Sequence, residues 1–415
     1  MTFAAARQQF AAYQKPDWTR MTESTKDDHK ALKTRTKLVY AGRRPSEQFG
    51  FVNTPVYRGS TVLFPSYHDL VTRNAPFTYG TSGSPTTKAL TDAWTELCGA
   101  AGAALAPTGL AAITLALLTA VKAGDHILVT DSIYRPSRIF CDGVLARLGV
   151  ETAYFDPLIG AGIEQLIRPN TSVIFLETPG SQSFELPDVP AIFAIARAKG
   201  ICAILDNTWA TPLFFPPHER GADMAIEAGT KYLSGHSDLL LGLISATAEW
   251  LPRLSATADA FAMCPGPEDV FLALRGLRTL ELRLREAQAQ GLAMARWLEG
   301  RPEIAAVLHP ALPSCPGHAL WKRDFYGSTG LFSVLLNPFP QKAVAAMLDG
   351  LELFGMGFSW GGFESLVIPF DCRAYRTATP WSPPGPALRF NIGLEDVEDL
   401  KADLERGFER LRAAS

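Results

Sequence analysis

The feature that most constrains the fold is an alternation of short apolar runs and longer helical runs between residues 88 and 210. The apolar runs are "GAALAPTG", "HILVTD", "TSVIFLETP" and "ICAILDNTWA". The runs of helical composition around them are "TKALTDAWTELCG", "LAAITLALLTAV", "YRPSRIFCDGVLARLG" and "DVPAIFAIARAKG". Strands that are apolar throughout are typical of a mostly parallel sheet covered by helices on both faces. The pattern therefore predicts an α/β fold that binds ligands at the carboxyl ends of its strands.

The pattern changes after residue 275. One long helix is predicted over 268–300, followed by the strand-like segments "GLFSVLL", "FGMGFSWGGFESLVI" and "PALRFNIGLED" and by a closing helix, "DVEDLKADLERGFERLR". This mixture is typical of a smaller α+β domain. We expect an N-terminal arm and inter-subunit segment at 1–80, an α/β domain at 81–275 and an α+β domain at 276–415.

Charge and cysteine usage exclude several classes of protein. A formal net charge of −3 argues against nucleic acid or an anionic membrane as the main partner, since both require a concentrated basic surface. The longest strongly apolar run, 110–121, stops at Lys122 and is too short to span a membrane. The six cysteines form no Cys-x-x-Cys pair and the seven histidines show no metal-ligand spacing, so no metal site is expected. These features, with no evident secretory signal, predict a cytoplasmic protein.

Four polar features follow apolar strands. Gly109, in "APTGLAAI", opens a helix whose free N–H groups suit a phosphate, although any helix start has such groups. Asp206 closes a strand, where a carboxylate either caps a helix or needs a ligand. Tyr134 follows "HILVTD" and either packs in the core or covers a flat ring. Lys231, in "EAGTKYLSGHSD", is either a solvated surface residue or a buried nucleophilic amine, whose small neighbours leave room for a group on its nitrogen.

One ligand accounts for all four features: pyridoxal 5′-phosphate (PLP). In this interpretation the helix start at Gly109 anchors the phosphate and Tyr134 stacks on the ring. Asp206 keeps the pyridine nitrogen protonated, and Lys231 holds the aldehyde as a Schiff base. The four residues together therefore predict a PLP site.

With these residues in place, the sequence resembles the Cys/Met-metabolism family of PLP enzymes, which have the aspartate aminotransferase fold (fold type I). The resemblance runs from "TKLVYAGRRP" to the C-terminus and rests on "DNTWATP", "TKYLSGHSD" and "RGLRTLELRL". Four further motifs resemble the β-lyase branch of the family: "HPALPSCPGH", "WKRDFYGSTGLFS", "SWGGFESL" and "IGLEDVEDL". The resemblance implies a seven-stranded type of sheet in a PLP-binding domain at 81–275.

The resemblance implies roles for residues around the cofactor. The backbone of Gly109 and Leu110 and the hydroxyl of Thr230 are expected to hold the phosphate. Lys231 is expected to act as general base on the substrate's α-proton, and either Lys231 or Tyr134 to protonate the leaving thiolate.

The resemblance also implies a substrate site. Arg389, in "ALRFNIG", is expected to hold the substrate α-carboxylate, although without the family it could equally be a surface salt-bridge residue. Ser359 and Trp360 are expected beside the substrate. Relatives that act at the γ-carbon carry a smaller aliphatic residue in place of Trp360, so its indole implies a narrower pocket; a packing role is the alternative.

Subunit contacts are implied by Tyr79, in "FTYGTSG". It resembles a tyrosine that reaches the cofactor and substrate of a neighbouring subunit, which implies dimers with shared active sites and a homotetramer. Relatives commonly have an arginine two residues later, bound to the neighbour's cofactor phosphate. Here the position is Thr81, so we expect another basic residue to compensate.

The activity that the resemblance implies is PLP-dependent β-elimination of L-cystathionine to homocysteine, pyruvate and ammonia, a step of transsulfuration in methionine biosynthesis. A cysteine or cystine β-lyase, and a γ-lyase or γ-synthase of the same family, remain alternatives. A PLP-binding protein with a regulatory role is an alternative of another class. A nicotinamide dehydrogenase is disfavoured, because no Gly-x-Gly-x-x-Gly follows a strand.

Overall fold

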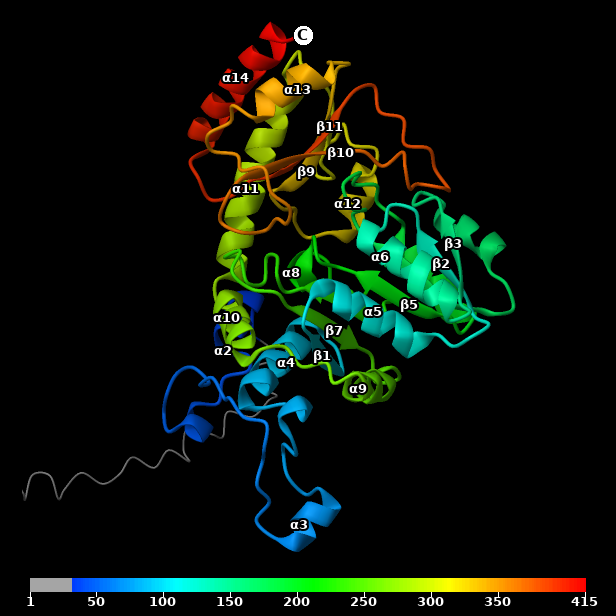
Figure 1. Cartoon of the computed structure of the whole chain (residues 1–415), viewed down its shortest axis with the longest axis vertical. Helices are drawn as coiled ribbons and strands as arrows, with labels where there is room; N and C mark the ends of the chain where they lie inside the picture. Colours follow the sequence, from blue (N-terminus) through cyan, green and yellow to red (C-terminus); the bar gives the residue numbers. More distant parts are fainter. Residues whose placement is uncertain (1–31) are drawn as a thin grey trace, which may run out of the picture.

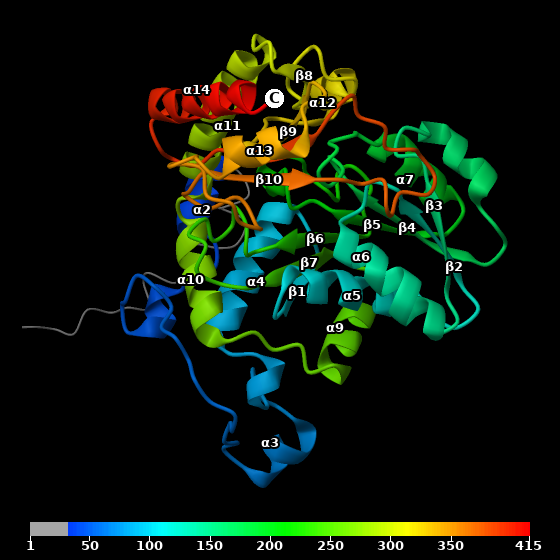
Figure 2. The same cartoon turned by 45° about the horizontal axis from the view of Figure 1, so that its top comes forward.

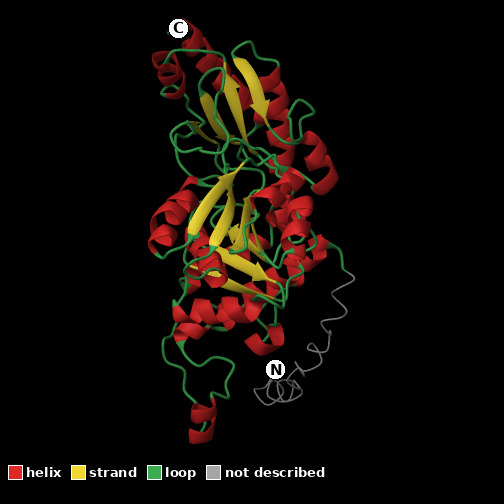
Figure 3. Cartoon of the chain, turned by 90° about the vertical axis from the view of Figure 1, so that its right-hand side faces the viewer, coloured by secondary structure: helices red, strands yellow, loops and turns green. Residues whose placement is uncertain are grey.

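The computed structural model describes residues 32–415, so the first part of the predicted arm, residues 1–31, lies outside the described residues. The described chain has a large sheet at its centre and a small sheet at its C-terminal end (Figure 1). Turned by 90°, the strands form two separate groups with helices around each (Figure 3). Residues 32–415 contain no helix that is both long and apolar enough to cross a membrane.

The large sheet has seven strands in the order β1-β7-β6-β5-β4-β2-β3. Its strands are β1 Gly102–Ala106, β2 His126–Thr130, β3 Glu151–Phe155, β4 Thr171–Glu177, β5 Cys202–Asp206, β6 Met224–Ala228 and β7 Gly242–Ala246. All neighbouring pairs from β6 to β3 are parallel, and only β7 runs antiparallel to its neighbours. The predicted mostly parallel α/β sheet is confirmed.

Three strands of this sheet were not predicted: β3, β6 and β7. β3 lies at the edge of the sheet, and most of its side chains are only partly buried. Its sequence, "ETAYF", therefore lacks the continuous apolar character by which the central strands were found.

Helices cover both faces of the large sheet. The core on one face contains side chains from α5 Gly109–Ala120, the π-helix η4 Cys141–Leu145 and α9 Leu251–Ala260. The core on the other face contains side chains from η5 Gly160–Leu166 and α7 Val189–Ala198. The helix predicted over 134–149 begins as α6 Arg135–Phe140 and then widens into η4.

The small sheet has four antiparallel strands in the order β10-β11-β9-β8. Its strands are β8 Ile304–Leu308, β9 Leu331–Leu336, β10 Leu366–Phe370 and β11 Ala387–Asn391. Its core also contains side chains from three helices, α11 Leu280–Glu299, α13 Gln341–Leu348 and α14 Val397–Ala413. The short helix α12 His318–Asp324 precedes β9. The closing helix and two of the strand-like segments are confirmed.

The single long helix predicted over 268–300 is wrong. The structure has two helices, α10 Pro267–Leu277 and α11, which meet at Arg278 and Thr279. Close to this break, a Cβ on Gly276 would lie 2.5 Å from the carbonyl oxygens of Leu233 and Ser234. Arg283 donates across the break to the carbonyl of Gly276 at 2.8 Å. These contacts come from a loop about 40 residues away, which helix periodicity does not reveal.

The arm begins with α2 Thr34–Tyr40, whose Leu38 packs in one core with side chains of α4 Pro85–Cys98. Beyond it come η2 Pro45–Gln48, α3 Tyr67–Thr72 and η3 Gly80–Ser82. Figures 1 and 2 both show α3 at the far end of the arm, away from the two sheets. α3 buries none of its own side chains, so nothing in the described chain covers it.

Candidate active site

A cavity of about 430 Å³ lies at the carboxyl ends of the central strands, between the two sheets. Its volume is in the range of small-molecule sites. Nine of the sequence-predicted site residues line it: Gly109, Leu110, Tyr134, Asp206, Thr230, Lys231, Ser359, Trp360 and Arg389. The chain therefore brings both predicted halves of the site together, from the α/β part and from the small sheet.

Lys231 lies in the turn that follows β6. Its Nζ donates a hydrogen bond to Ser359 Oγ at 2.7 Å and lies 5.2 Å from the centre of the Trp360 ring. Burial, with a smaller contribution from the charge of Arg389, lowers the pKa of Lys231 to about 8, and the charge of Asp206 opposes this shift. About a tenth of this amine is therefore neutral at pH 7, far more than for an exposed lysine, and the neutral form is the one that a nucleophile or base requires.

Of the small neighbours of Lys231, Thr230 lines the cavity, but the two glycines have another purpose than the one expected. A Cβ on Gly229 would lie 2.9 Å from Leu243 Cδ1, and one on Gly235 would overlap the guanidinium of Arg283. Neither glycine lines the cavity. The expectation that they make room for a ligand is wrong, because they let the backbone approach other side chains closely.

Asp206 ends β5 and is only 8% exposed. Its Oδ1 accepts from the backbone N–H of Thr208 at 3.0 Å and from its hydroxyl at 2.6 Å. Its Oδ2 has no hydrogen-bond partner anywhere in residues 32–415. Burial raises the pKa of Asp206, whereas the bonds from Thr208 and the charge of Lys231 lower it. The carboxyl thus has one supported oxygen and one free to accept from a ligand.

Two further carboxyls lie near Asp206, and sequence reasoning missed both. Glu177 pairs with Asp206 in the β4–β5 register, and Glu227 is on β6. Burial, followed by the charge of Asp206, raises the pKa of both glutamates well above their ordinary value. We infer that both are neutral, so that Asp206 carries the negative charge of this group. Glu177 follows an apolar strand as Asp206 does, and the same signal could have found it.

Tyr134 is held over the cavity by its backbone, since its N–H donates to Glu177 Oε2 at 2.6 Å. Its side chain is 44% exposed. Partial burial, then the charges of Glu177 and Asp206, raise the pKa of Tyr134, so its phenol keeps its proton at neutral pH.

The helix start at Gly109 has the geometry of an anion site. Thr108 caps α5 by accepting from the N–H of Ala111 at 3.0 Å, while the first N–H groups of a helix have no intrahelical partner. A Cβ on Gly109 would lie 2.7 Å from Ala228 Cβ, so only glycine fits there. Thr230 Oγ1 donates to the carbonyl of Leu241 at 3.3 Å, a long bond that a ligand could replace.

Arg389, on β11, is the guanidinium on the small-sheet side of the cavity. It donates to the backbone carbonyl of Ser359 at 2.9 Å and forms no ion pair with any residue of the described chain. Burial lowers its pKa to about 10, so it stays charged at neutral pH. A partly buried, unpaired guanidinium suits a carboxylate ligand.

Ser359 and Trp360 lie on an irregular turn, not on a strand. Ser359 has a positive φ of 86°, and only the last part of "FGMGFSWGGFESLVI" becomes a strand, β10. The strand expected across the rest of that segment is wrong. The Trp360 ring lies 5.5 Å from the Tyr232 ring and also lines the cavity, so its packing and pocket roles coexist.

Tyr79 is the one predicted site residue outside the cavity of its own chain. It is 52% exposed, pairs with Thr61 in an isolated bridge on the arm, and precedes η3, which contains Thr81. Its predicted role in a neighbouring subunit's site stays a prediction.

A family model for Cys/Met metabolism PLP-dependent enzymes matches residues 35–409. The chain belongs to this family. The chain is 44% identical over 387 residues to the cystathionine beta-lyase of Salmonella typhimurium, covering 91% of this chain and 98% of that one. It is 43% identical to the Escherichia coli cystathionine beta-lyase, over the same shares. The crystal structure of metB from Corynebacterium glutamicum superposes with a TM-score of 0.86 at 28% identity, covering 92% of this chain and 99% of that one.

Family membership confirms PLP as the cofactor and fold type I as the architecture. The residues of this Cys/Met-metabolism enzyme fit PLP at three points of the cavity. Asp206 has an oxygen without a partner, the α5 start has free N–H groups beside an obligatory glycine, and Lys231 is a partly buried amine with a lowered pKa.

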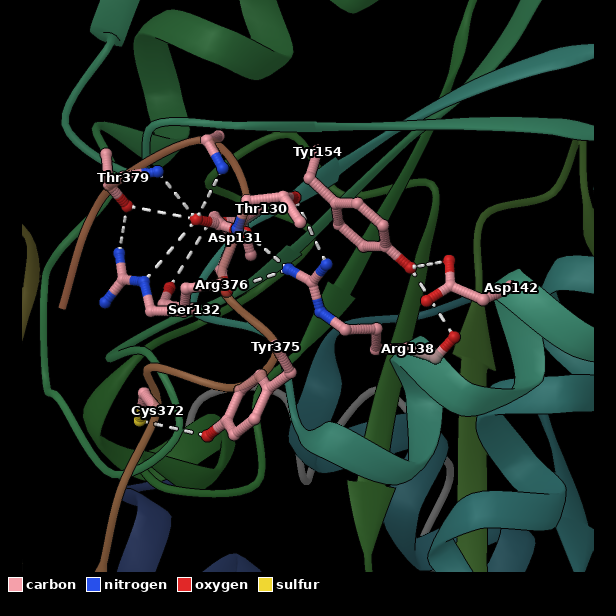
Figure 4. Close-up of polar contacts among 12 residues, drawn as sticks. Thr130, Asp131, Ser132, Arg138, Asp142, Tyr154, Cys372, Tyr375, Arg376 and Thr379 are labelled. Atoms are coloured by element: carbon pink, nitrogen blue, oxygen red, sulfur yellow. Dashed lines mark hydrogen bonds and ion pairs between the residues drawn. The ribbon is translucent and has the colours of Figure 1, made fainter.

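A polar cluster beside the cavity was also missed in the sequence (Figure 4). Asp131, fully buried after β2, forms ion pairs with Arg138 and Arg376. It also accepts from the backbone N–H groups of Thr377, Ala378 and Thr379 at 3.1, 2.9 and 2.8 Å. We call residues 372–379, between β10 and β11, the strap. Asp131 thus joins the strap to the loop that carries Tyr134.

Proposed function

We propose that this enzyme catalyses β-elimination of L-cystathionine to homocysteine, pyruvate and ammonia. The observation that carries the proposal is the position of Lys231: a partly buried amine with a pKa of about 8, in one cavity with Asp206, Arg389 and Trp360. The cystathionine beta-lyases that share 43–44% of its residues support the same reaction.

The cofactor would be held by residues of this chain. The N–H groups of Gly109 and Leu110 and the hydroxyl of Thr230 would bind its phosphate, and Tyr134 would cover its ring. Asp206 Oδ2 would accept a hydrogen bond from the protonated ring nitrogen. PLP supplies the electron sink that makes the α-proton of an amino acid acidic.

The protein's own groups then position the substrate and move its protons. Arg389 binds the α-carboxylate through its guanidinium. Lys231 Nζ takes the α-proton, and its hydrogen bond to Ser359 Oγ orients the amine. Either Lys231 or the protonated phenol of Tyr134 returns a proton to the leaving thiolate. Trp360 narrows the cavity beside Lys231, which favours cleavage at the β-carbon over reaction at the γ-carbon.

Assembly and location are part of this proposal. We infer dimers that share active sites through Tyr79 and pair into a homotetramer. Large apolar side chains stand exposed on the arm, such as Phe49 at 90% and Leu63 at 87%, which supports a covered surface there. We propose a cytoplasmic location, since all six cysteines are free thiols and five of them are buried.

The test is Lys231→Ala in purified enzyme loaded with PLP. We expect pyruvate release from L-cystathionine and the visible absorbance of the lysine-bound cofactor both to disappear. Survival of both signals would refute the assignment. The wild-type enzyme separates the alternatives: 2-oxobutyrate in place of pyruvate indicates γ-elimination, and a higher kcat/KM for cystine or cysteine indicates another β-lyase.

A further inference from the structure

The cavity contains a cation that the proposed reaction does not use. This cation is Arg135, which follows Tyr134 in the sequence and is the first residue of α6. It lines the cavity, and its side chain is exposed. It forms no ion pair or side-chain hydrogen bond with any of residues 32–415. Its guanidinium lies over the ring of Tyr375, with 5.5 Å between the guanidinium carbon and the ring centre. An unpaired arginine at the rim of an amino-acid site is available to bind an anion.

The guanidinium of Arg135 rests on the ring of Tyr375, which is itself held in place. Tyr375 belongs to the strap, and its hydroxyl donates to Cys372 Sγ at 2.9 Å. Arg376, the next residue, pairs with both Asp131 and Glu185. These contacts fix the ring on which the guanidinium rests (Figure 4 shows Tyr375 beside the Asp131 cluster). Cation–π contact with a fixed ring restricts the guanidinium while its N–H groups stay free.

The two unpaired arginines of the cavity come from different walls. Arg389 is on β11 of the small sheet, and Arg135 is on α6 of the large one. The proposed substrate has two amino-acid ends joined through sulfur, each with a carboxylate. If Arg389 binds the carboxylate of the end that is cleaved, the other carboxylate needs a second cation. Lys231 is engaged in the reaction, which leaves Arg135 among the described cations of the cavity.

We propose that Arg135, steadied by Tyr375, binds the distal carboxylate of the thioether substrate and so sets a preference for substrates with two amino-acid ends. The inference rests on the proposed function and deepens it. It names a binding contact in the ground state and no part in the chemical step, so it predicts an effect on KM more than on kcat.

The experiment compares two substrates in the PLP-loaded enzyme: L-cystathionine, and S-ethyl-L-cysteine, which has the same scissile bond but no distal carboxylate. For Arg135→Gln we expect kcat/KM for L-cystathionine to fall by about tenfold to a hundredfold, as for loss of one charge-assisted hydrogen bond, mostly through KM. The kcat/KM for S-ethyl-L-cysteine should change by less than about twofold. Arg135→Lys should restore part of the cystathionine value, since it keeps the charge without the fork.

Two variants control for indirect effects. Arg373→Gln removes an exposed arginine of the strap that pairs with Asp371 and does not line the cavity, so both substrates should keep their wild-type values. Tyr375→Phe keeps the ring under Arg135 but removes its hydrogen bond to Cys372, so any loss in kcat/KM for L-cystathionine should be smaller than in Arg135→Gln, with no change for S-ethyl-L-cysteine. Equal losses for both substrates in Arg135→Gln, or a cystathionine value within about twofold of wild type, would overturn the inference. Absence of pyruvate from L-cystathionine with the wild-type enzyme would instead refute the proposed function itself.

Discussion

Replacing Asp131 by asparagine tests whether the strap is held by a buried charge. The side chains of Asp131, Arg138 and Arg376 are 0%, 4% and 3% exposed. In Asp131→Asn both guanidiniums would face a neutral amide, whose NH₂ group cannot accept from Thr379 or from the arginines. Arg376 keeps Glu185, but Arg138 loses its only ion pair among the described residues.

The expected cost follows from this burial. Removing one partner of a buried ion pair costs about 3–5 kcal/mol, because the remaining charge stays desolvated. With a urea dependence of about 3 kcal/mol per molar, the unfolding midpoint should fall by about 1–1.7 M. The measurement is urea unfolding of the PLP-loaded enzyme, followed by circular dichroism. Asp371→Asn is the matched control: it also breaks an arginine pair at the strap, but both partners are at least 48% exposed.

The pH dependence supplies a second check with a defined sign. Burial raises the pKa of Asp131, but the N–H groups of Thr379 and Thr377 and the charge of Arg138 outweigh it, so the pKa lies below its ordinary value. Because the pKa of Asp131 is lower in the folded than in the unfolded protein, its ionised carboxylate stabilises the folded protein at pH values above the unfolded pKa, about 4. This stabilisation is lost as the pH falls through the pKa of the folded protein. The wild-type advantage over Asp131→Asn should therefore be constant between about pH 6 and 8 and shrink below about pH 4. An asparagine variant as stable as the Asp371→Asn control at pH 7 would refute the reasoning.

Three residues of the cavity give further predictions. In apoenzyme, the rate at which Lys231 recombines with added PLP should rise with pH and level off above the pKa of Lys231, about 8. Stopped-flow absorbance measures this rate, and a rate that still rises steeply near pH 10.5 would contradict the burial of Lys231. Gly109→Ala should weaken PLP binding by about 10–100-fold, since its Cβ would overlap Ala228; titration of apoenzyme with PLP measures this, and unchanged affinity would count against the phosphate site. Glu227→Gln should keep kcat/KM for pyruvate release within about twofold at neutral pH, because the buried carboxyl is already neutral; a loss above about tenfold would show that its charge matters.

Three of the strands that could be predicted are the long apolar ones buried on both sides, whereas the buried strands β6 and β7 were missed. β2, β4 and β5 are continuous apolar strands, and each ends in or just before a polar residue of the site or its neighbourhood, which is why Asp131, Glu177 and Asp206 share one edge. Their apolar runs could be found without tertiary information. Lys231 and Arg389 were predicted through the family resemblance and the chemistry of PLP, and the fold brings them into one cavity.

The features that escaped prediction depend on contacts between distant segments. The break after α10 requires the loop at Leu233, and the environment of Arg135 requires Tyr375, 240 residues away. Gly229 shows the same limit within a motif. The motif that contains this glycine was singled out in the sequence. The side chains that exclude a Cβ there belong to Leu243, on β7, and to Leu241, just before β7. The local sequence pattern therefore identifies such residues but does not reveal which distant side chains they contact.

The charges of the cavity bear on the threonine at position 81. Five ionisable side chains line the cavity: the bases Arg135, Lys231 and Arg389, and the acids Glu177 and Asp206. Burial raises the pKa of Glu177, which favours its neutral form, so the positive charges of the cavity outnumber the negative ones. A cavity of this sign attracts the phosphate of PLP and the carboxylates of an amino acid. The family's arginine after Tyr79 adds a positive charge from a neighbouring subunit, and its replacement by a neutral hydroxyl is easier to tolerate where the chain's own walls carry this excess.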